Sequence, residues 1–365
     1  MPFISPPISE LDISRASDSI RSGWLVPGDY SSVLEKDLSN FFRADNCFLT
    51  SSCTHAIQIA LHLAGVGQGD EVITSTLTWV AAPNSVLWAG AAPIFVDVDP
   101  QTFLMTPEIC QRAITSRTKA IIITHLYGQM CDVVGFKELA DKYGILIIED
   151  CAHALEADYQ GIRPGQITFA AAFSFHAAKN ITSGQGGALI VEADRKTVLM
   201  ARRHGVVNDA EGIRRMQSFG GKFEMTDFQA ALLIGQLERI EEIKLARTNV
   251  WNFYEQLCLM YGVKHPINLE LGYHARYQFV IKLDTSQKRN SARRVLRELG
   301  IETSVHFTPV HLEPFYLNRE LELSLPISEN IGETIISLPT HVKVGANEKN
   351  QLANAFAILR REGLI

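Results

Sequence analysis

Lys179 is the residue of this chain best placed for covalent chemistry. It lies in the stretch 173–180, Phe-Ser-Phe-His-Ala-Ala-Lys-Asn, directly after an apolar run and before the glycine-rich turn 183–187. An amine beside apolar walls and a phosphorylated neighbour can lose its proton and form a Schiff base. The alternative is a lysine on the surface of a loop, where most lysines lie. The position of Lys179 suggests Schiff-base chemistry but needs support from other residues.

A strand-end aspartate could support such chemistry. Asp150 follows the run 145–149, where a buried parallel strand would emerge at the ligand-binding edge of its sheet. A pyridoxal ring needs an acid that keeps its pyridine nitrogen protonated, because this positive charge lets the ring accept electrons from a substrate carbanion. The alternative is that Asp150 caps a short helix beginning at Cys151. The two roles are compatible.

Two further segments provide candidate contacts to a phosphorylated ring. Residues 50–56, Thr-Ser-Ser-Cys-Thr-His-Ala, precede an apolar helical stretch, so hydroxyls and backbone amides could bind a phosphate at the helix N-terminus. An ordinary N-cap is the alternative reading of this segment. Trp79 follows the next strand and could stack on a ring, although a buried tryptophan is more often part of the core.

These residues need a scaffold that brings strand ends together, and the sequence predicts one. From about residue 50 to 195, short apolar runs alternate with helical patterns, which is typical of parallel strands joined by crossover helices. In such sheets, ligands bind at the carboxyl ends of the strands. The predicted fold class is α/β, with strands at 71–75, 93–97, 119–124, 145–149, 169–173 and 187–191.

The C-terminal third of the chain has a different pattern. Between Thr226 and about Met260, apolar residues recur at helical spacing, which predicts a long connecting helix with one kink. After this helix the sequence predicts a smaller α+β domain, with extended runs at 277–281 and 303–307, a helix around 291–299 and a closing helix after Asn347. We therefore expect a large domain over residues 1–245 and a small C-terminal domain over residues 246–365.

Composition argues against several classes of protein. The 365 residues are 46% hydrophobic and 20% charged, with a formal net charge of −6 and no basic stripe for nucleic acid. The six cysteines show no ordered spacing, which argues against zinc or a disulfide framework and fits a reducing cytoplasm. No apolar run approaches the roughly 20 residues of a membrane helix, and no signal peptide is indicated. We expect a cytoplasmic protein that binds no metal, nucleic acid or membrane.

Six stretches of the chain resemble one enzyme family, the DegT/DnrJ/EryC1/StrS family of pyridoxal-phosphate sugar aminotransferases. The resemblance extends over nearly the whole chain, from residues 22–28 to 338–339. It implies the aspartate-aminotransferase fold (PLP-dependent transferase fold type I), in which helices flank a mostly parallel central sheet and a smaller C-terminal α+β domain follows. The six stretches are 69–73, 95–99, 113–120, 125–128, 149–154 and 173–180.

The resemblance also implies roles for individual residues. Lys179 would form the Schiff base with pyridoxal 5′-phosphate, and Asp150 would pair with the pyridine nitrogen. Trp79 would stack on the ring, and His153 would lie beside the ring hydroxyl. Lys179 further implies amino transfer, because the dehydratases of this family resemble it but have histidine at this position. Contacts to the phosphate would come from Ser52, Cys53 and Ser174.

Two loops bear on the partner subunit and the substrate. In the stretch 220–231 many family members read Gly-Tyr-Asn-Tyr-Arg, whereas this chain has Lys222 in place of Asn and Glu224 in place of Arg. Because this loop reaches the partner's cofactor in the family, the resemblance implies that Lys222 lies near the phosphate, while Glu224 has no assigned role. The alternative is that both residues are solvated charges on a loop. The turn 305–311 resembles the loop that lines the sugar-nucleotide site, so His306 is a candidate substrate contact, or else a structural histidine.

Together these features predict a homodimeric aminotransferase with its active sites at the subunit interface. An amino acid, expected to be L-glutamate, would convert the cofactor to pyridoxamine 5′-phosphate, and a nucleotide-linked keto-sugar would then accept the amine. A 4-keto sugar is favoured and a 3-keto sugar stays open. The alternatives are a non-nucleotide cyclic ketone such as an inosose, or a PLP-binding regulatory protein without turnover, which Glu224 keeps open.

Overall fold

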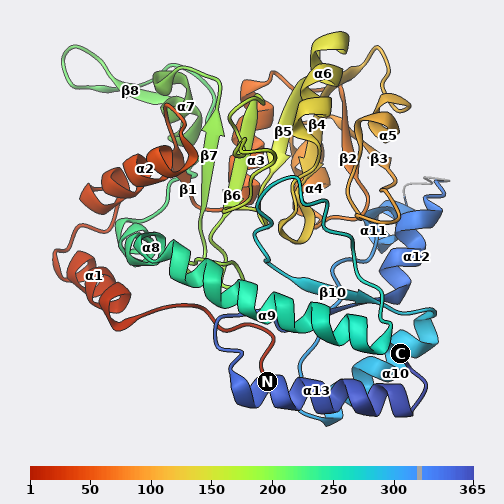
Figure 1. Ribbon diagram of the computed structural model, residues 1–365. Coiled ribbons are helices and arrows are strands. Elements are labelled where there is room, and N and C mark those ends of the chain that lie inside the picture. Colours follow the sequence, from red (N-terminus) through yellow and green to blue (C-terminus); the bar gives the residue numbers. More distant parts are fainter. Residues whose placement is uncertain (319–322) are drawn as a thin grey trace.

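A seven-stranded sheet forms the centre of the larger part of the molecule (Figure 1). The computed structural model describes residues 1–318 and 323–365. The strands are β1 (Phe48–Thr50), β2 (Glu71–Ser75), β3 (Ala92–Val96), β4 (Thr118–Thr124), β5 (Leu146–Asp150), β6 (Ala170–Ser174) and β7 (Gly187–Val191). Their order is β1-β7-β6-β5-β4-β2-β3, in which β3, β2, β4, β5 and β6 are parallel. Strand β7 runs antiparallel to both β6 and β1. The predicted α/β class with a mostly parallel sheet is confirmed.

Helices cover both faces of this sheet. One face packs against α3 (Cys53–Leu63), α4 (Ala81–Trp88) and α7 (Arg195–Arg202). The other packs against α2 (Asp29–Phe42), α5 (Pro107–Gln111), α6 (Val133–Tyr143) and α8 (Asp227–Glu238). The helix α1 (Glu10–Arg21) lies on α8, and the hairpin of β8 (Val206–Asn208) and β9 (Arg214–Met216) projects from the sheet edge near α7.

The strands read as continuous apolar runs because both of their faces are buried. Alternate residues of β4 enter different clusters: Ile121 and Ile123 pack with α2 and α6, whereas Ala120 and Ile122 pack with α3. The same alternation in β5 sends Ile147 to the first face and Ile148 to the second. The parity of a residue therefore decides which layer of helices its side chain meets.

The predicted long helix with one kink is confirmed as two consecutive helices. Helix α8 ends at Glu238 and α9 (Ile240–Tyr261) begins after Arg239, whose backbone is not helical. In Figure 1, α9 runs along the lower edge of the large sheet toward the C-terminal part. The proposed boundary between residues 245 and 246 falls inside α9, and it stays a prediction.

The C-terminal part packs helices around a two-stranded antiparallel sheet. The predicted run 303–307 is not a strand, because only Ser304 pairs, through a single bridge to Ser337. No helix within the described ranges is long and apolar enough to cross a membrane. The elements of this part are β10 (Phe279–Lys282), α10 (Ser286–Glu298), the 3-10 turn η2 (Val310–Leu312), α11 (Pro314–Leu317), α12 (Pro326–Thr334), β11 (Ile335–Leu338) and α13 (Ala346–Arg361). A second 3-10 turn, η1 (Leu126–Gly128), follows β4 in the larger part.

Candidate active site

Asp150 is the last residue of β5, and its side chain points toward the N-terminus of α3. It shares the parity of Ile148, which packs on the α3 face of the sheet. The Sγ of Cys53, the first residue of α3, lies 3.9 Å from Asp150 Oδ1, and the backbone N–H of Ala152 donates to the same oxygen at 3.0 Å. A turn follows Asp150 in place of a helix, so the carboxylate caps a turn. The strand end thus fixes a buried acid beside the helix N-terminus.

The predicted phosphate contacts converge at this same helix N-terminus. Ser52 is the N-cap of α3, with its Oγ accepting from the His55 N–H at 3.1 Å. Ser174 pairs with Gly187 in the sheet, and Gly187 approaches the Ser52–Cys53 backbone so closely that a Cβ would lie 2.5 Å from Cys53 N. Because β1, β7 and β6 are neighbours in the sheet, Ser52, Cys53 and Ser174 lie close together. They lie beside the N–H groups of the first turn of α3, which have no partner within the helix.

Lys179 lies in a closed loop between β6 and β7. A backbone hydrogen bond from Phe175 to Gly186, at 2.9 Å, holds the two sides of this loop together. The next residue, Asn180, is buried, and its Nδ2 donates to both carboxylate oxygens of Glu156 at 3.0 Å. The backbone that carries Lys179 is thereby fixed on both sides.

A row of rings lines the space in front of the Lys179 amine. The amine lies 3.4 Å from the Tyr277 hydroxyl and 4.5 Å from the centroid of the Tyr277 ring. His153 stacks on Tyr277 with centroids 4.2 Å apart, and Phe307 follows at 6.0 Å from His153. Trp79 lies 5.8 Å from Phe307 and is 59% exposed, so it is not part of the core and its ring is open to a ligand.

The charge of Lys179 affects the pKa values of Asp150, His153 and His306. Burial raises the pKa of Asp150, and the Ala152 N–H and the charge of Lys179 offset only part of this effect. Burial, together with the charges of Lys179 and His306, holds the pKa of His153 well below its usual range. Burial and the charge of Lys179 lower the pKa of His306 to about 4. Both histidines are therefore neutral at physiological pH, where they can accept or donate a hydrogen bond without adding charge.

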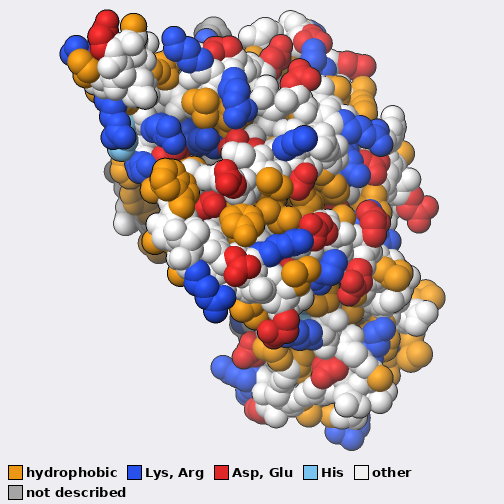
Figure 2. All heavy atoms as spheres, turned by 90° about the vertical axis from the view of Figure 1, so that its left-hand side faces the viewer, with side chains coloured by type: hydrophobic (Ala, Val, Ile, Leu, Met, Phe, Trp, Pro, Cys, Tyr) orange, Lys and Arg blue, Asp and Glu red, His pale blue; other side chains and the backbone are white. Residues whose placement is uncertain are grey.

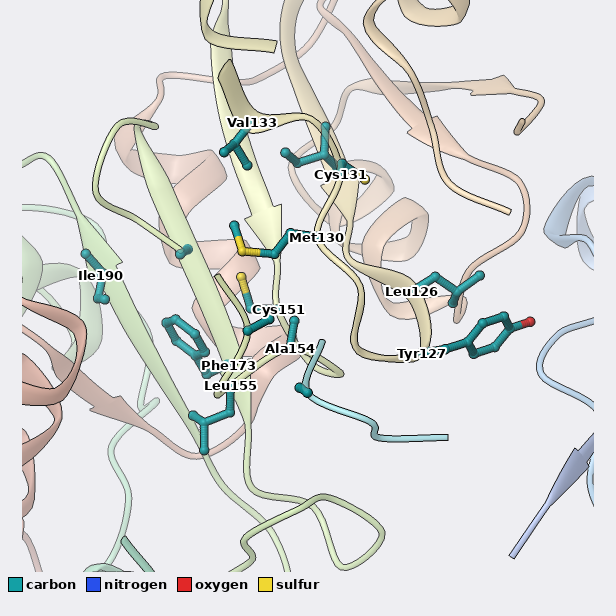
Figure 3. Close-up of a cluster of buried hydrophobic side chains, with 14 of the residues drawn as sticks. Leu126, Tyr127, Met130, Cys131, Val133, Cys151, Ala154, Leu155, Phe173 and Ile190 are labelled. Carbon is teal, nitrogen blue, oxygen red and sulfur yellow. The ribbon is translucent and has the colours of Figure 1, made fainter. Parts of the chain in front are cut away.

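His306 lies on the C-terminal side of the site and is held from three directions. Its Nδ1 lies 3.0 Å from Ser337 Oγ, and the Phe3 ring stacks on it at 5.6 Å. Tyr127 donates its hydroxyl to the His306 carbonyl. In Figure 3 the Tyr127 ring points away from the apolar cluster around Cys151, which leaves its hydroxyl free for this contact. The substrate-contact candidate thus has a defined position beside Lys179.

A second buried cluster lies behind Asp150. The side chains of His125, Glu149 and Cys151 offer donor atoms within 4.8 Å of one another. Both ring nitrogens of His125 already have partners, because Nδ1 accepts from the Cys131 N–H at 3.0 Å and Nε2 lies 2.6 Å from Glu149 Oε2. The Gly165 N–H donates to the other Glu149 oxygen at 2.7 Å. We interpret this cluster as a support for the ends of β4 and β5.

The side chain of Lys222, the remaining predicted site residue, pairs with an acid of its own loop and not with the residues around Lys179. Its amine pairs with Glu224, and Arg203 binds the same carboxylate at 2.7 Å. Only 2% of the Glu224 side chain is exposed, against 58% for each of the two cations. Burial alone would raise the pKa of Glu224, but the hydrogen bonds and charges of Lys222 and Arg203 outweigh it, so this pKa is lowered. The negative charge of Glu224 is thus compensated by Lys222 from its own loop and by Arg203 from the end of α7.

Replacing Glu224 with glutamine removes both ion pairs and should lower the free energy of unfolding by on the order of 1 kcal/mol at pH 7. The effect stays this small because solvent screens the exposed cations Lys222 and Arg203. The folded-state pKa is lowered, so this contribution is present above the unfolded pKa of about 4.3 and is lost as the pH falls through the folded value. Urea unfolding at pH 7 and under acid conditions measures it. Glu241→Gln, at a residue whose side chain is 75% exposed, is the control. Equal effects of Glu224→Gln at both pH values would contradict the assignment.

Tyr277 is the main site residue that the sequence did not reveal. It was expected to begin a strand at 277–281, but the strand begins only at Phe279, which leaves Tyr277 in the preceding segment. Its hydroxyl reaches Lys179 across 98 positions of the chain. The one signal in the sequence is a tyrosine, whose polar end needs a partner when it is buried, at the start of a mainly apolar run.

The assembled side chains fit pyridoxal 5′-phosphate. Both hydrogen bonds that described residues direct at the Asp150 side chain end on Oδ1, which leaves Oδ2 for a pyridinium N–H. Lys179 could hold the aldehyde carbon, and Trp79 could cover one face of the ring. The helix N-terminus at Ser52 and Cys53, with Ser174, provides donors for a phosphate.

Comparisons with known proteins agree with this chemistry. Three structures of Spr1654 from Streptococcus pneumoniae, a candidate sugar aminotransferase, are 28% identical to this chain and cover 100% of it. The apo, pyridoxamine-phosphate and pyridoxal-phosphate forms match with TM-scores of 0.95, 0.94 and 0.93 over 98%, 100% and 99% of that chain. An aminotransferase from Psychrobacter cryohalolentis is 28% identical, with a TM-score of 0.92 over 99% of each chain. DesV from S. venezuelae is 27% identical, with a TM-score of 0.89 over 99% of each chain.

The fold is therefore the aminotransferase fold, and the cofactor is pyridoxal 5′-phosphate with pyridoxamine 5′-phosphate as its second form. The sequence profile of the DegT/DnrJ/EryC1/StrS aminotransferase family matches residues 6–357. The chain is a PLP-dependent aminotransferase and belongs to the DegT/DnrJ/EryC1/StrS aminotransferase family.

Proposed function

We propose that this enzyme transfers an amino group from L-glutamate to a nucleotide-linked keto-sugar, with a 4-keto group as the preferred acceptor. The observation that carries the proposal is the position of the Lys179 amine. It lies within the electrostatic reach of a buried strand-end acid, Asp150, and in contact with the row of rings that ends at the exposed Trp79. The family description and the match to a candidate sugar aminotransferase support a sugar acceptor.

The residues around Lys179 have defined tasks in this proposal. Bound pyridoxal phosphate supplies an electron sink for the bond that breaks at the substrate carbon. Asp150 holds a proton on the ring nitrogen, and its burial strengthens that ion pair. Lys179 holds the cofactor and, once displaced by a substrate amine, moves the proton at the substrate carbon. Trp79 covers one face of the ring and excludes water from it.

The remaining contacts bind and orient. Ser52, Cys53 and Ser174 hold the phosphate at the N-terminus of α3, while His153 lies beside the ring hydroxyl. His306 contacts the sugar as a neutral imidazole, because its pKa is lowered to about 4. A neutral His306 makes sugar binding independent of its ionisation above about pH 5.

The active unit in this proposal is a homodimer in which Lys222 of one copy faces the phosphate in the other. The support is a group of exposed hydrophobic side chains on the side of the molecule that carries α1 and α2, where Figure 2 shows hydrophobic and charged side chains intermingled. Trp24, Leu25 and Val26, between these helices, are 59%, 46% and 54% exposed. Such a concentration of exposed apolar groups is typical of an interface.

A substrate screen tests the acceptor. The enzyme in its pyridoxamine form is mixed with nucleotide-linked 4-keto-hexoses, a 4-keto-pentose, a 3-keto-hexose and an inosose, and return of the visible cofactor band is followed. Rapid return with a 4-keto nucleotide sugar, and slow return with the free sugar, is the expected result. Return with the inosose alone would replace the proposal by a carbocyclic ketone, and return with none of them would overturn a sugar acceptor.

A further inference from the structure

The Lys179 amine has a partner in the structure that the proposed function does not use. Tyr277 approaches it in two ways, with the hydroxyl at 3.4 Å and with the ring face at 4.5 Å from the centroid. A phenol oxygen can accept a hydrogen bond from an ammonium, and an aromatic face attracts the same cation. Tyr277 can therefore hold this amine when it is charged.

The backbone of Tyr277 is fixed by buried groups on both sides. Arg247 is buried and donates through Nη2 to the Tyr277 carbonyl and through Nε to the Arg276 carbonyl at 3.1 Å. On the other side, the Tyr277 N–H donates to the Tyr127 carbonyl at 3.1 Å. Gly128 lies so close that a Cβ there would come within 3.0 Å of Tyr277 N, and its φ of +111° suits only glycine.

The ring of Tyr277 is also set in its orientation. His153 stacks on it at 4.2 Å with 28° between the planes. Because the backbone and one ring face are both held, the hydroxyl has little freedom to move away from Lys179. A tyrosine held in this way is pre-organised, so little entropy is lost when the amine binds to it.

Such a partner has a use in the chemistry of amino transfer. A lysine that holds the cofactor is displaced when the amino donor takes its place, and it must then stay close enough to move a proton at the substrate carbon. We propose that Tyr277 is a catalytic residue that receives the displaced Lys179 amine and holds it in position for this proton transfer. The inference rests on the role of Lys179 proposed above.

Tyr277→Phe isolates the hydroxyl, because phenylalanine keeps the ring and its stack on His153. We expect this variant to bind the cofactor normally and to be bleached by saturating L-glutamate about tenfold more slowly, with little change in the KM for glutamate. The rate difference between L-glutamate and its α-deuterated form should increase, because proton transfer becomes slower relative to the other steps. A purely structural role would not raise this isotope effect.

Tyr273→Phe is the matched control from the same segment. Its ring lies 4.3 Å from the amine of Lys244, which is a different lysine from the one that Tyr277 contacts. This variant should keep the wild-type rate and isotope effect. Wild-type rates in Tyr277→Phe, or a loss confined to KM or to cofactor affinity, would overturn the inference.

Hydroxylamine separates this inference from the choice of donor. It displaces lysine from the cofactor in any enzyme of this kind: its nitrogen forms the new C=N bond as the bond to Lys179 breaks, and both of its N–H protons pass to the leaving lysine amine. Displacement should be slower in Tyr277→Phe than in the wild type and in Tyr273→Phe. If glutamate fails with the wild type but this difference persists, the proposed donor is wrong and the role of Tyr277 stands; equal displacement rates would contradict that role.

Discussion

Replacing Lys179 with alanine is expected to abolish amino transfer, with a loss of at least about 10⁴-fold in turnover. One side chain both holds the cofactor and moves the proton, and general-base catalysis alone contributes about 10²–10⁴-fold. The variant should also lack the visible band of a lysine-bound cofactor. Absorbance spectra with added pyridoxal 5′-phosphate, and the rate of 2-oxoglutarate formation, measure both effects.

The fold should survive this change, because Lys179 lies on a loop whose backbone is held by Asn180 and by the Phe175–Gly186 hydrogen bond. Lys142→Ala, on the surface of α6, is the control for loss of a lysine and should keep wild-type activity. A Lys179→Ala protein that is yellow and turns over at even a hundredth of the wild-type rate would place the essential lysine elsewhere.

Asp150→Asn is expected to reduce turnover by about 10²–10⁴-fold while leaving the protein folded. Asparagine keeps the volume but cannot hold a proton on the ring nitrogen, and breaking one buried ion pair costs about 3–5 kcal/mol. Cofactor affinity should fall with turnover. Single-turnover rates with L-glutamate and a titration with pyridoxal 5′-phosphate measure the two losses.

Although Asp150→Asn should reduce turnover and cofactor affinity, it should not destabilise the apo-protein at pH 7. Burial raises the folded-state pKa of Asp150, so its ionisation destabilises the fold increasingly as the pH rises above the unfolded pKa of about 3.9. Asp150→Asn should therefore be at least as stable as the wild type at pH 7, with the advantage disappearing in acid. Asp141→Asn, at an exposed residue of α6, is the control and should change neither property. An Asp150→Asn apo-protein that is less stable at pH 7 would mean that the carboxylate is mainly structural.

The sheet could be predicted from the sequence because its strands are long apolar runs bounded by turn residues. The predicted strands 71–75 and 187–191 have the observed bounds, and β3, β4, β5 and β6 differ by one residue at either end or both. Strands β1, β8 and β9 were not predicted, since three residues are too few for a pattern to emerge. The run 303–307 has the apolar pattern of a strand, but only Ser304 pairs, through one bridge to Ser337 of β11.

The candidate site could be predicted only where its residues follow strands in order. Asp150 ends β5 and Lys179 lies in the loop that follows β6, so the rule that ligands bind at the carboxyl ends of strands brings them together. Tyr277 could not be found in this way, because it comes from the C-terminal part and approaches Lys179 only in the folded chain. The ion pair that compensates Glu224 could not be predicted either, since its partner Arg203 lies 21 positions earlier in the chain. The structure was also needed to show that Trp79 is exposed, which decides between a core residue and a residue that stacks on a bound ring.

The most direct test of the central claim is the absorbance spectrum of the purified wild-type protein before and after addition of excess L-glutamate. We expect a visible band from the cofactor bound to Lys179, and its loss when glutamate converts the cofactor to the pyridoxamine form. A protein that shows no band even after pyridoxal 5′-phosphate is added would contradict the assignment of Lys179 and its site. A band that every amino acid leaves unchanged would contradict the proposed amino transfer.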